Sequence, residues 1–156
     1  MAVGVRFGFL VFVIALFITQ AATAKTIAVC GASSGMSYNI QGGLIQPGKS
    51  GWEKDGISNG LVMLIQDGKV FDIISQDATG GTRSAKADGA LVMPIGGLKF
   101  KKGELTVLVV VIYKGATSEH YLFRSHGTKG ELLWGQLKMN ALVSKGFLFR
   151  SECQFY

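Results

Sequence analysis

Short runs of apolar and β-branched residues, separated by glycines, follow one another along the chain beyond residue 24. This spacing is typical of β-strands joined by turns, and no stretch of useful length carries the periodicity of an amphipathic helix. Asp67-Gly68 lies between two such runs and indicates a tight hairpin, because the corner needs positive φ. The predicted strands cover residues 26–30, 37–40, 61–66, 70–75, 91–95, 98–101, 105–113, 119–125, 132–139 and 147–153.

Two of these runs suggest their place in a sheet. The run at 105–113 is almost wholly apolar and rich in β-branched residues, which predicts a central strand covered on both faces. The run at 91–95 contains Pro94, which has no N–H to donate and therefore favours an edge. The whole pattern predicts an all-β fold, either an antiparallel β-sandwich or a closed β-barrel of about eight to nine strands.

The first 24 residues differ from the rest. Arg6 precedes an uncharged apolar run at 7–18, and small residues follow at 22–24. The run holds about 12 residues against the roughly 20 that a membrane-spanning helix needs, and the three features together are typical of a secretory signal peptide. We therefore predict a cleavable signal peptide over 1–24, export to the periplasm or the extracellular space, and one all-β domain over 25–156. An uncleaved N-terminal anchor is the alternative, and no later segment is predicted to span a membrane.

Charge narrows the choice of partners only a little. The formal net charge of +6 falls to +5 when Arg6 is removed with the signal peptide. The positive residues are spread along the chain, and the densest group is Lys99, Lys101 and Lys102. Binding to nucleic acid needs a concentrated patch, so none is predicted, whereas a diffuse excess favours contact with anionic surfaces of the cell envelope.

The sequence contains two cysteines, Cys30 and Cys153, near the two ends of the predicted domain. Because export leads to an oxidising compartment, a single disulfide between them is the favoured interpretation. Two free thiols or an intermolecular pair are the alternatives. The chain has only two histidines, His120 and His126, so neither a metal site nor any cofactor is predicted.

Two short strings resemble nucleotide-binding motifs but lack their setting. The string at 43–50 (GLIQPGKS) matches a phosphate-binding loop letter for letter, yet a glycine-rich stretch follows where a helix should begin, and Pro47 removes a backbone donor. The string at 26–37 (TIAVCGASSGMS) resembles the first turn of short-chain dehydrogenases, but no tyrosine in the chain has a lysine four residues later. No nucleotide is therefore predicted as a ligand.

A third string fits an exported protein. The residues SGMSY at 34–38 and TKG at 128–130 resemble motifs of the bacterial inhibitors of C-type lysozyme, which are small exported β-barrels. The resemblance implies that Ser34, Tyr38 and Lys129 enter a lysozyme cleft. Arg124 stands where that family has tyrosine, and the two strings lie much farther apart than in the family.

No reaction can be assigned from the remaining residues. Trp52 lies in a glycine-rich segment and is expected in a loop, where a tryptophan can stack on a ligand or anchor an interface. We therefore expect a non-catalytic binding or interaction module that recognises an unknown protein or envelope component, with Trp52, Tyr38 and Lys129 as candidate contacts. A small exported hydrolase using loop carboxylates such as Asp72 and Asp77 is the alternative from another class.

Overall fold

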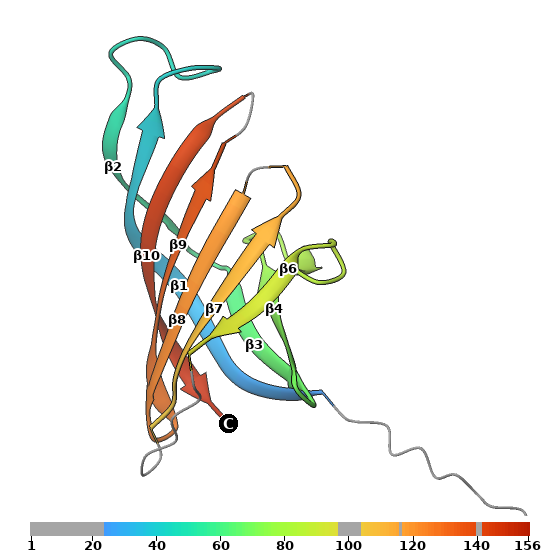
Figure 1. Cartoon of the computed structure of the whole chain (residues 1–156). Coiled ribbons are helices and arrows are strands. Elements are labelled where there is room, and N and C mark those ends of the chain that lie inside the picture. Colours follow the sequence, from blue (N-terminus) through green and yellow to red (C-terminus); the bar gives the residue numbers. More distant parts are fainter. Residues whose placement is uncertain (1–23, 97–103, 116, 140–141) are drawn as a thin grey trace, which may run out of the picture.

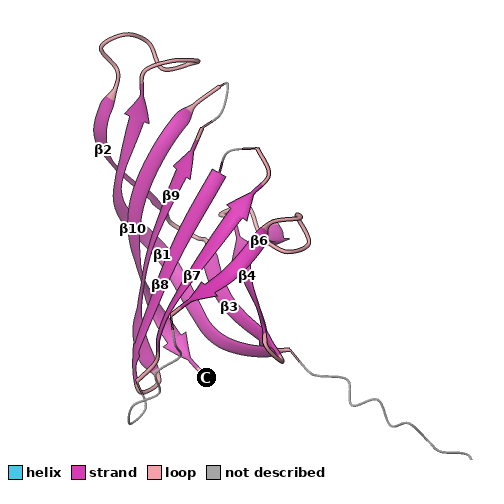
Figure 2. Ribbon diagram, in the orientation of Figure 1, coloured by secondary structure: helices cyan, strands magenta, loops and turns pink. Residues whose placement is uncertain are grey.

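The computed structural model describes residues 24–96, 104–115, 117–139 and 142–156. Figure 2 shows strands and loops only in this part of the chain, and none of it forms a helix able to cross a membrane. The strands are β1 (Lys25–Ile40), β2 (Gly51–Ile57), β3 (Leu61–Asp67), β4 (Val70–Gln76), β5 (Thr82–Ser84), β6 (Leu91–Ile95), β7 (Thr106–Tyr113), β8 (Thr117–His126), β9 (Lys129–Lys138) and β10 (Ser144–Phe155).

All ten strands form one antiparallel sheet, which curls into a half-barrel (Figure 1). Their order is β5-β4-β3-β1-β10-β9-β8-β7-β6, and β2 pairs with β1 beside this path. The predicted all-β, antiparallel character is confirmed. The described strands number ten rather than eight or nine, and no hydrogen-bonded pairing among them joins β5 to β6.

The long strand β1 is the centre of this sheet. One of its edges pairs with β10 along most of its length, while the other pairs first with β3 and then with β2. The segment 37–40, predicted as a separate strand, is instead the end of β1. Glycine and serine at 31–37 have little intrinsic strand propensity, but neighbours on both edges satisfy their backbone groups and keep them extended.

A β-bulge lies where β1 changes partners. Gly31 and Ala32 together oppose one residue of β10, between the Cys30 and Ser33 pairings. The hydroxyl of Ser151 lies 2.8 Å and 3.0 Å from the carbonyl oxygens of Gly31 and Ala32, so the bulge has a polar partner inside the protein. The extra residue shifts the inward–outward alternation of β1 by one position. Cys30 and Ser33, three residues apart, are therefore both buried on the inner face.

The predicted disulfide between Cys30 and Cys153 is confirmed. The two cysteines are direct partners in the β1–β10 register, and their Cα atoms lie 4.0 Å apart. Both side chains are buried. The bridge therefore ties the first strand to the last one inside the half-barrel.

The inner face changes character along the barrel axis. We call the end where β1, β7 and β9 finish the open end, and the end with the β3–β4 and β8–β9 turns the hairpin end. From the hairpin end to the middle the inner face is an apolar core, whose members include Ile27, Leu64, Phe71, Ile73, Val107, Val109, Phe123, Leu132, Phe149 and Phe155. The last inner row at the open end is largely polar and consists of Tyr113, Thr117, Lys138, Lys145 and Asn39.

Three detailed strand predictions can be compared with the structure. Pro94 lies on β6, at one edge of the sheet, as predicted. The run at 105–113 forms β7 but is second from that edge, and its outward Ile112 is 43% exposed, so the prediction of a fully covered central strand is wrong. The predicted strand at 98–101 lies outside the described residues.

The predicted hairpin at Asp67-Gly68 exists with a corner one residue farther on. Asp67 pairs with Val70, which leaves Gly68 and Lys69 as the turn. Gly68 adopts the positive φ of 58° that the corner requires.

Replacing both Cys30 and Cys153 by alanine should lower the stability strongly. The bridge spans 123 residues, and closing a loop of this length restricts the unfolded chain by about 4 to 5 kcal/mol in the loop-entropy account. Urea unfolding of the variant and of the unreduced protein measures the difference. A loss below about 1 kcal/mol would show that β1–β10 pairing does not need the bridge.

Candidate functional site

A cavity of about 480 Å³ opens on the concave face near the open end. This volume lies within the range of small-molecule sites. Strands from both halves of the sheet line it, which the curvature of the half-barrel makes possible. Its lining includes Ile57, Val62, Ser75, Gln76, Asp77, Arg83, Tyr113, Thr117, Glu119, Tyr121, Trp134, Gln136, Lys138 and Phe147.

Aromatic rings from adjacent strands form one wall of this cavity. Tyr121 of β8 is the direct partner of Trp134 of β9, which is in turn the partner of Phe149 of β10. The Tyr121 and Trp134 rings stack with centroids 5.5 Å apart, and Phe147 meets the indole edge-on at 4.7 Å. Strand alternation places every second residue inside, so neighbouring strands stack their rings into one layer.

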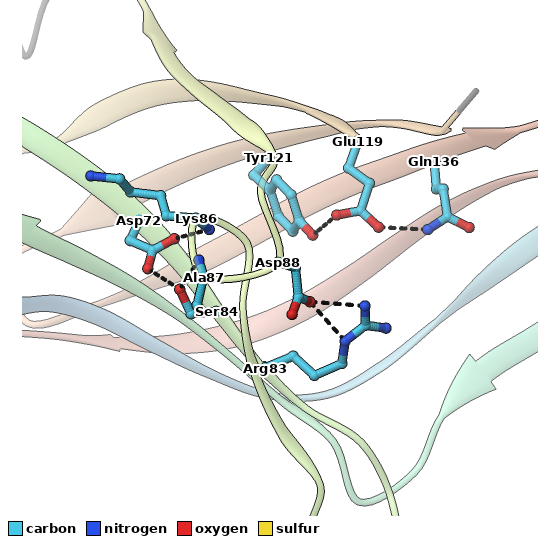
Figure 3. Close-up of polar contacts among 9 residues, drawn as sticks. All are labelled: Asp72, Arg83, Ser84, Lys86, Ala87, Asp88, Glu119, Tyr121 and Gln136. Atoms are coloured by element: carbon cyan, nitrogen blue, oxygen red, sulfur yellow. Dashed lines mark hydrogen bonds and ion pairs between the residues drawn. The ribbon is translucent and has the colours of Figure 1, made fainter. Parts of the chain in front are cut away.

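A buried carboxylate lies one row nearer the open end. Glu119 is only 8% exposed. Its Oε2 accepts a hydrogen bond of 2.6 Å from the Tyr121 hydroxyl, and its Oε1 accepts one of 2.5 Å from Gln136 Nε2 (Figure 3). No ion pair of Glu119 occurs among the described residues, so neutral donors hold this carboxylate in place.

Two tyrosines beside Glu119 resist ionisation. Burial raises the pKa of Tyr121 well above its ordinary value, and the negative charge of Glu119 raises it further. The same two causes, in the same order, raise the pKa of Tyr113. Both phenols therefore stay protonated at neutral pH and serve as hydrogen-bond donors in the wall of the cavity.

The indole of Trp134 carries the clearest sign of an incomplete site. The residue is 6% exposed, and its Nε1 is buried with no hydrogen-bond partner among the described residues. A buried donor without an acceptor costs about 1–3 kcal/mol. Trp134 also lines the cavity, so this unpaired donor belongs to a residue of the cavity wall.

The rim of the cavity is polar and charged. Arg83 lines the cavity and forms an ion pair of 2.8 Å with Asp88 (Figure 3). Lys138 is exposed and makes no ion pair with any described residue. A ligand that reaches the rim thus meets a cation, Lys138, that no described acidic side chain neutralises.

The two carboxylates considered for a hydrolase both have partners within the protein, and Asp72 lies on β4 rather than in a loop. Asp72 accepts hydrogen bonds from the Ser84 hydroxyl at 2.6 Å and from the Lys86 backbone N–H at 3.1 Å. Asp77 accepts from Thr79 and from the Gly81 backbone within its own turn, and these bonds lower its pKa. The structure therefore uses both as turn-stabilising groups.

Two of the three predicted contact residues lie together. Tyr38 and Trp52 are direct partners across β1 and β2, and their rings meet edge-on with centroids 5.3 Å apart. The two side chains point outward and are 37% and 66% exposed. Trp52 is on a strand rather than in the predicted loop, because pairing with β1 extends the glycine-rich segment that contains it.

The third predicted contact, Lys129, lies at the hairpin end. It pairs with Gln154 of β10, whereas Tyr38 pairs with Gly146. Eight residues of strand separate these positions along β10, which corresponds to roughly 26 Å. Ser34 and Tyr38 are thus near each other on β1, but Lys129 does not join them on one patch.

The two strings that resemble nucleotide-binding motifs lie in a loop and in a strand. The string at 43–50 connects β1 to β2, and a strand rather than a helix begins at Gly51. The string at 26–37 lies within β1. Among the described residues, no group of three histidine, cysteine, aspartate or glutamate side chains is placed to hold a metal ion.

The predictions from the sequence did not include the polar group inside the cavity. Glu119, Tyr121, Trp134 and Gln136 all alternate with outward residues on β8 and β9, so strand periodicity alone puts them on the inner face. The available signal was a glutamate and a glutamine at inward positions of otherwise apolar strand faces. Such residues are buried only with partners, and those partners depend on a register that the sequence does not reveal.

Alkaline conditions should destabilise the protein through the buried phenol of Tyr121 and the partly buried phenol of Tyr113. Below about pH 10 they are protonated in both states, whereas above it they ionise more readily in the unfolded chain, so stability falls as pH rises. Urea unfolding at about pH 8 and about pH 11 should show a smaller loss in Tyr113→Phe than in the unchanged protein. An equal loss in both would contradict the assigned role of Tyr113.

Comparison of the chain with models of known protein families, with curated proteins and with solved structures gives no match.

Proposed function

We propose that the protein is an exported, non-catalytic binding module of the cell envelope that holds a small ligand in its concave cavity. The observation that carries this proposal is the buried, unpaired indole N–H of Trp134 in the wall of a cavity of about 480 Å³. Asp77 is engaged within its own turn and Asp72 with Ser84, which favours binding over acid–base catalysis by these two carboxylates.

The lining indicates the chemistry of the ligand. The aromatic layer of Tyr121, Trp134 and Phe147 suits an apolar or ring-shaped part. Trp134 requires a hydrogen-bond acceptor, and Tyr113 and Thr117 add hydroxyls near the rim. A compact molecule with one apolar face and several oxygen atoms, such as a saccharide unit or a short peptide, matches this combination.

Two features support export. β1 begins at Lys25, directly after the predicted cleavage site, so removal of residues 1–24 leaves every described strand whole. The disulfide is compatible with an oxidising compartment outside the cytoplasm.

Closure of the half-barrel is part of the proposal. β4 and β6 lie in contact, and the Ala90 backbone N–H donates to the Ala85 carbonyl in the segment between β5 and β6. Ala90 and Val92 pack against the core from this side. We propose that this segment closes the barrel by side-chain packing and leaves the cavity accessible at the open end.

The other two functions have less support. A lysozyme inhibitor on the pattern of the resembling family needs Lys129 near Tyr38, and the register separates them. A hydrolase needs two carboxylates on one substrate, whereas Asp77 is held by its own turn and Asp72 by the segment at 84–86.

Ligand binding can be followed with Trp134 as the reporter. The sequence has two tryptophans, so Trp52→Phe leaves Trp134 as the only one. In this variant, addition of monosaccharides, disaccharides and short cell-wall peptides should shift indole emission and raise the melting temperature for at least one class. If no class changes either quantity at millimolar concentration, the cavity is not a site for such ligands.

A second variant tests the role of the indole N–H. Trp134→Phe keeps an aromatic ring but removes the donor, which should weaken binding about tenfold because one buried hydrogen bond is lost. Isothermal titration of the best ligand measures the change, and Trp52→Phe is the matched control with unchanged affinity. Equal affinity in both variants would place the ligand elsewhere.

The intact mass of the exported protein tests its processing. We expect a chain that starts at Lys25 and whose mass is two hydrogens lower than that of the reduced form, because Cys30 and Cys153 are joined. A mass that includes residues 1–24 would contradict the proposed cleavage.

A further inference from the structure

The most exposed hydrophobic side chains gather at the open end. Six large hydrophobic residues of the described chain are more than 60% exposed, and one of them is the final residue, Tyr156. The other five lie at or next to the open end and are Leu44 at 68%, Trp52 at 66%, Leu137 at 63%, Met139 at 68% and Leu142 at 64%. Folding normally covers such groups, so their concentration at one end marks an interaction surface.

The loops that carry these residues are held together. The backbone N–H of Leu44, between β1 and β2, donates a hydrogen bond of 2.8 Å to the carbonyl oxygen of Leu142, just before β10. Gly42 and Ile45 bridge each other within the first loop. Two leucines from distant parts of the sequence are thus presented side by side, in the region where Figure 1 shows the β1–β2 connection farthest from the hairpin end.

An outward row of residues continues this surface down the sheet. Trp52, Tyr38, Gly146 and Leu137 are successive partners across β2, β1, β10 and β9. A Cβ atom on Gly146 would lie 3.1 Å from Cδ2 of Leu137, so the leucine covers the space that the glycine leaves. We name the surface formed by Leu44, Trp52, Tyr38, Leu137, Met139 and Leu142 the apolar tip.

The charges around the apolar tip are positive. Lys49 in the first loop, Lys54 on the outer side of β2 and Lys138 at the end of β9 are exposed and have no ion pair with any described residue. Of the two acids nearby only Asp55 has a cationic partner, so the three lysines exceed the one remaining negative charge, that of Glu53. Glu53 accepts a hydrogen bond of 2.6 Å from Asn39 Nδ2, and Asp55 forms an ion pair of 2.5 Å with Lys145.

We propose that the apolar tip docks the protein onto a lipid bilayer surface that carries anionic headgroups. Leucine and methionine side chains on protruding loops enter the boundary of the acyl chains, a tryptophan and a tyrosine lie at headgroup depth, and lysines meet the phosphates. This proposal goes beyond ligand binding in the cavity and does not depend on it.

Charge favours a bilayer over a second copy of the chain. In a two-fold dimer each copy brings the same patch to the interface, so Lys49, Lys54 and Lys138 would face their own copies, with only Glu53 of each copy to balance them. An anionic membrane supplies negative charge that balances the lysines. A bilayer also accepts an irregular pair of loops without shape complementarity.

Vesicle flotation tests this docking. The full-length sequence is expressed, and the protein is purified in the form that the cell delivers. It should float with phosphatidylglycerol-containing vesicles and much less with vesicles of pure phosphatidylcholine. Replacing Leu44 and Leu142 together by serine should weaken binding about tenfold or more, because two apolar anchors are lost. Val70→Ser, an exposed position at the hairpin end, is the matched control and should bind as the unchanged protein does.

A spectroscopic readout locates the contact. Vesicles should shift the emission of Trp52 to shorter wavelength and protect it from aqueous iodide, and Trp134→Phe should keep this response because it leaves the apolar tip intact. Unchanged flotation of the double serine variant, with the same melting temperature as the parent, would overturn the proposal. So would a tip-dependent dimer in sedimentation that binds no vesicles, since a second copy would then be the occupant.

Discussion

The pairing of β1 with β10, which the Cys30–Cys153 disulfide cross-links, is the constraint on which the rest of the structure depends. It joins the first strand to the last, and every other strand belongs to one side of this pair. β2 and β3 pair with the free edge of β1, and β4 and β5 follow β3, whereas β9, β8, β7 and β6 extend from β10. Without the pairing the chain would hold two separate sheets, neither of which could enclose a core.

The cavity is a consequence of the same pairing. The bulge at Gly31 keeps β1 in register with β10 beyond the disulfide, and the strand then runs on to Ile40 with β2 as its second neighbour. The apolar core fills the hairpin end and the middle, and the polar inner rows of the open end are left to line a cavity. The unpaired Trp134 N–H is a local cost that the surrounding core and disulfide can sustain, and a bound acceptor would remove it.

Features that depend on local chemistry could be predicted from the sequence. Two cysteines in a chain with a predicted signal peptide predicted the bridge, the missing N–H of Pro94 predicted an edge, and glycine predicted the β3–β4 turn to within one residue. Features that depend on which strands pair with one another could not be predicted from the sequence. Trp52 is on a strand only because β1 pairs with it, and the group around Glu119 exists only because the register places β8 beside β9. Residues far apart in the sequence thus create both the cavity and the apolar tip.

Backbone amide hydrogen exchange tests the central claim, that the stapled β1–β10 pair is the most stable part of the molecule. The account predicts that amides beside Cys30 and Cys153 exchange only through global unfolding, and that those of β2 and the loop at 41–50 exchange orders of magnitude faster through local opening. Reduction of the disulfide should then accelerate exchange across the whole sheet. Amides of β1 and β10 that exchange as fast as those of β2 in the oxidised protein would contradict it.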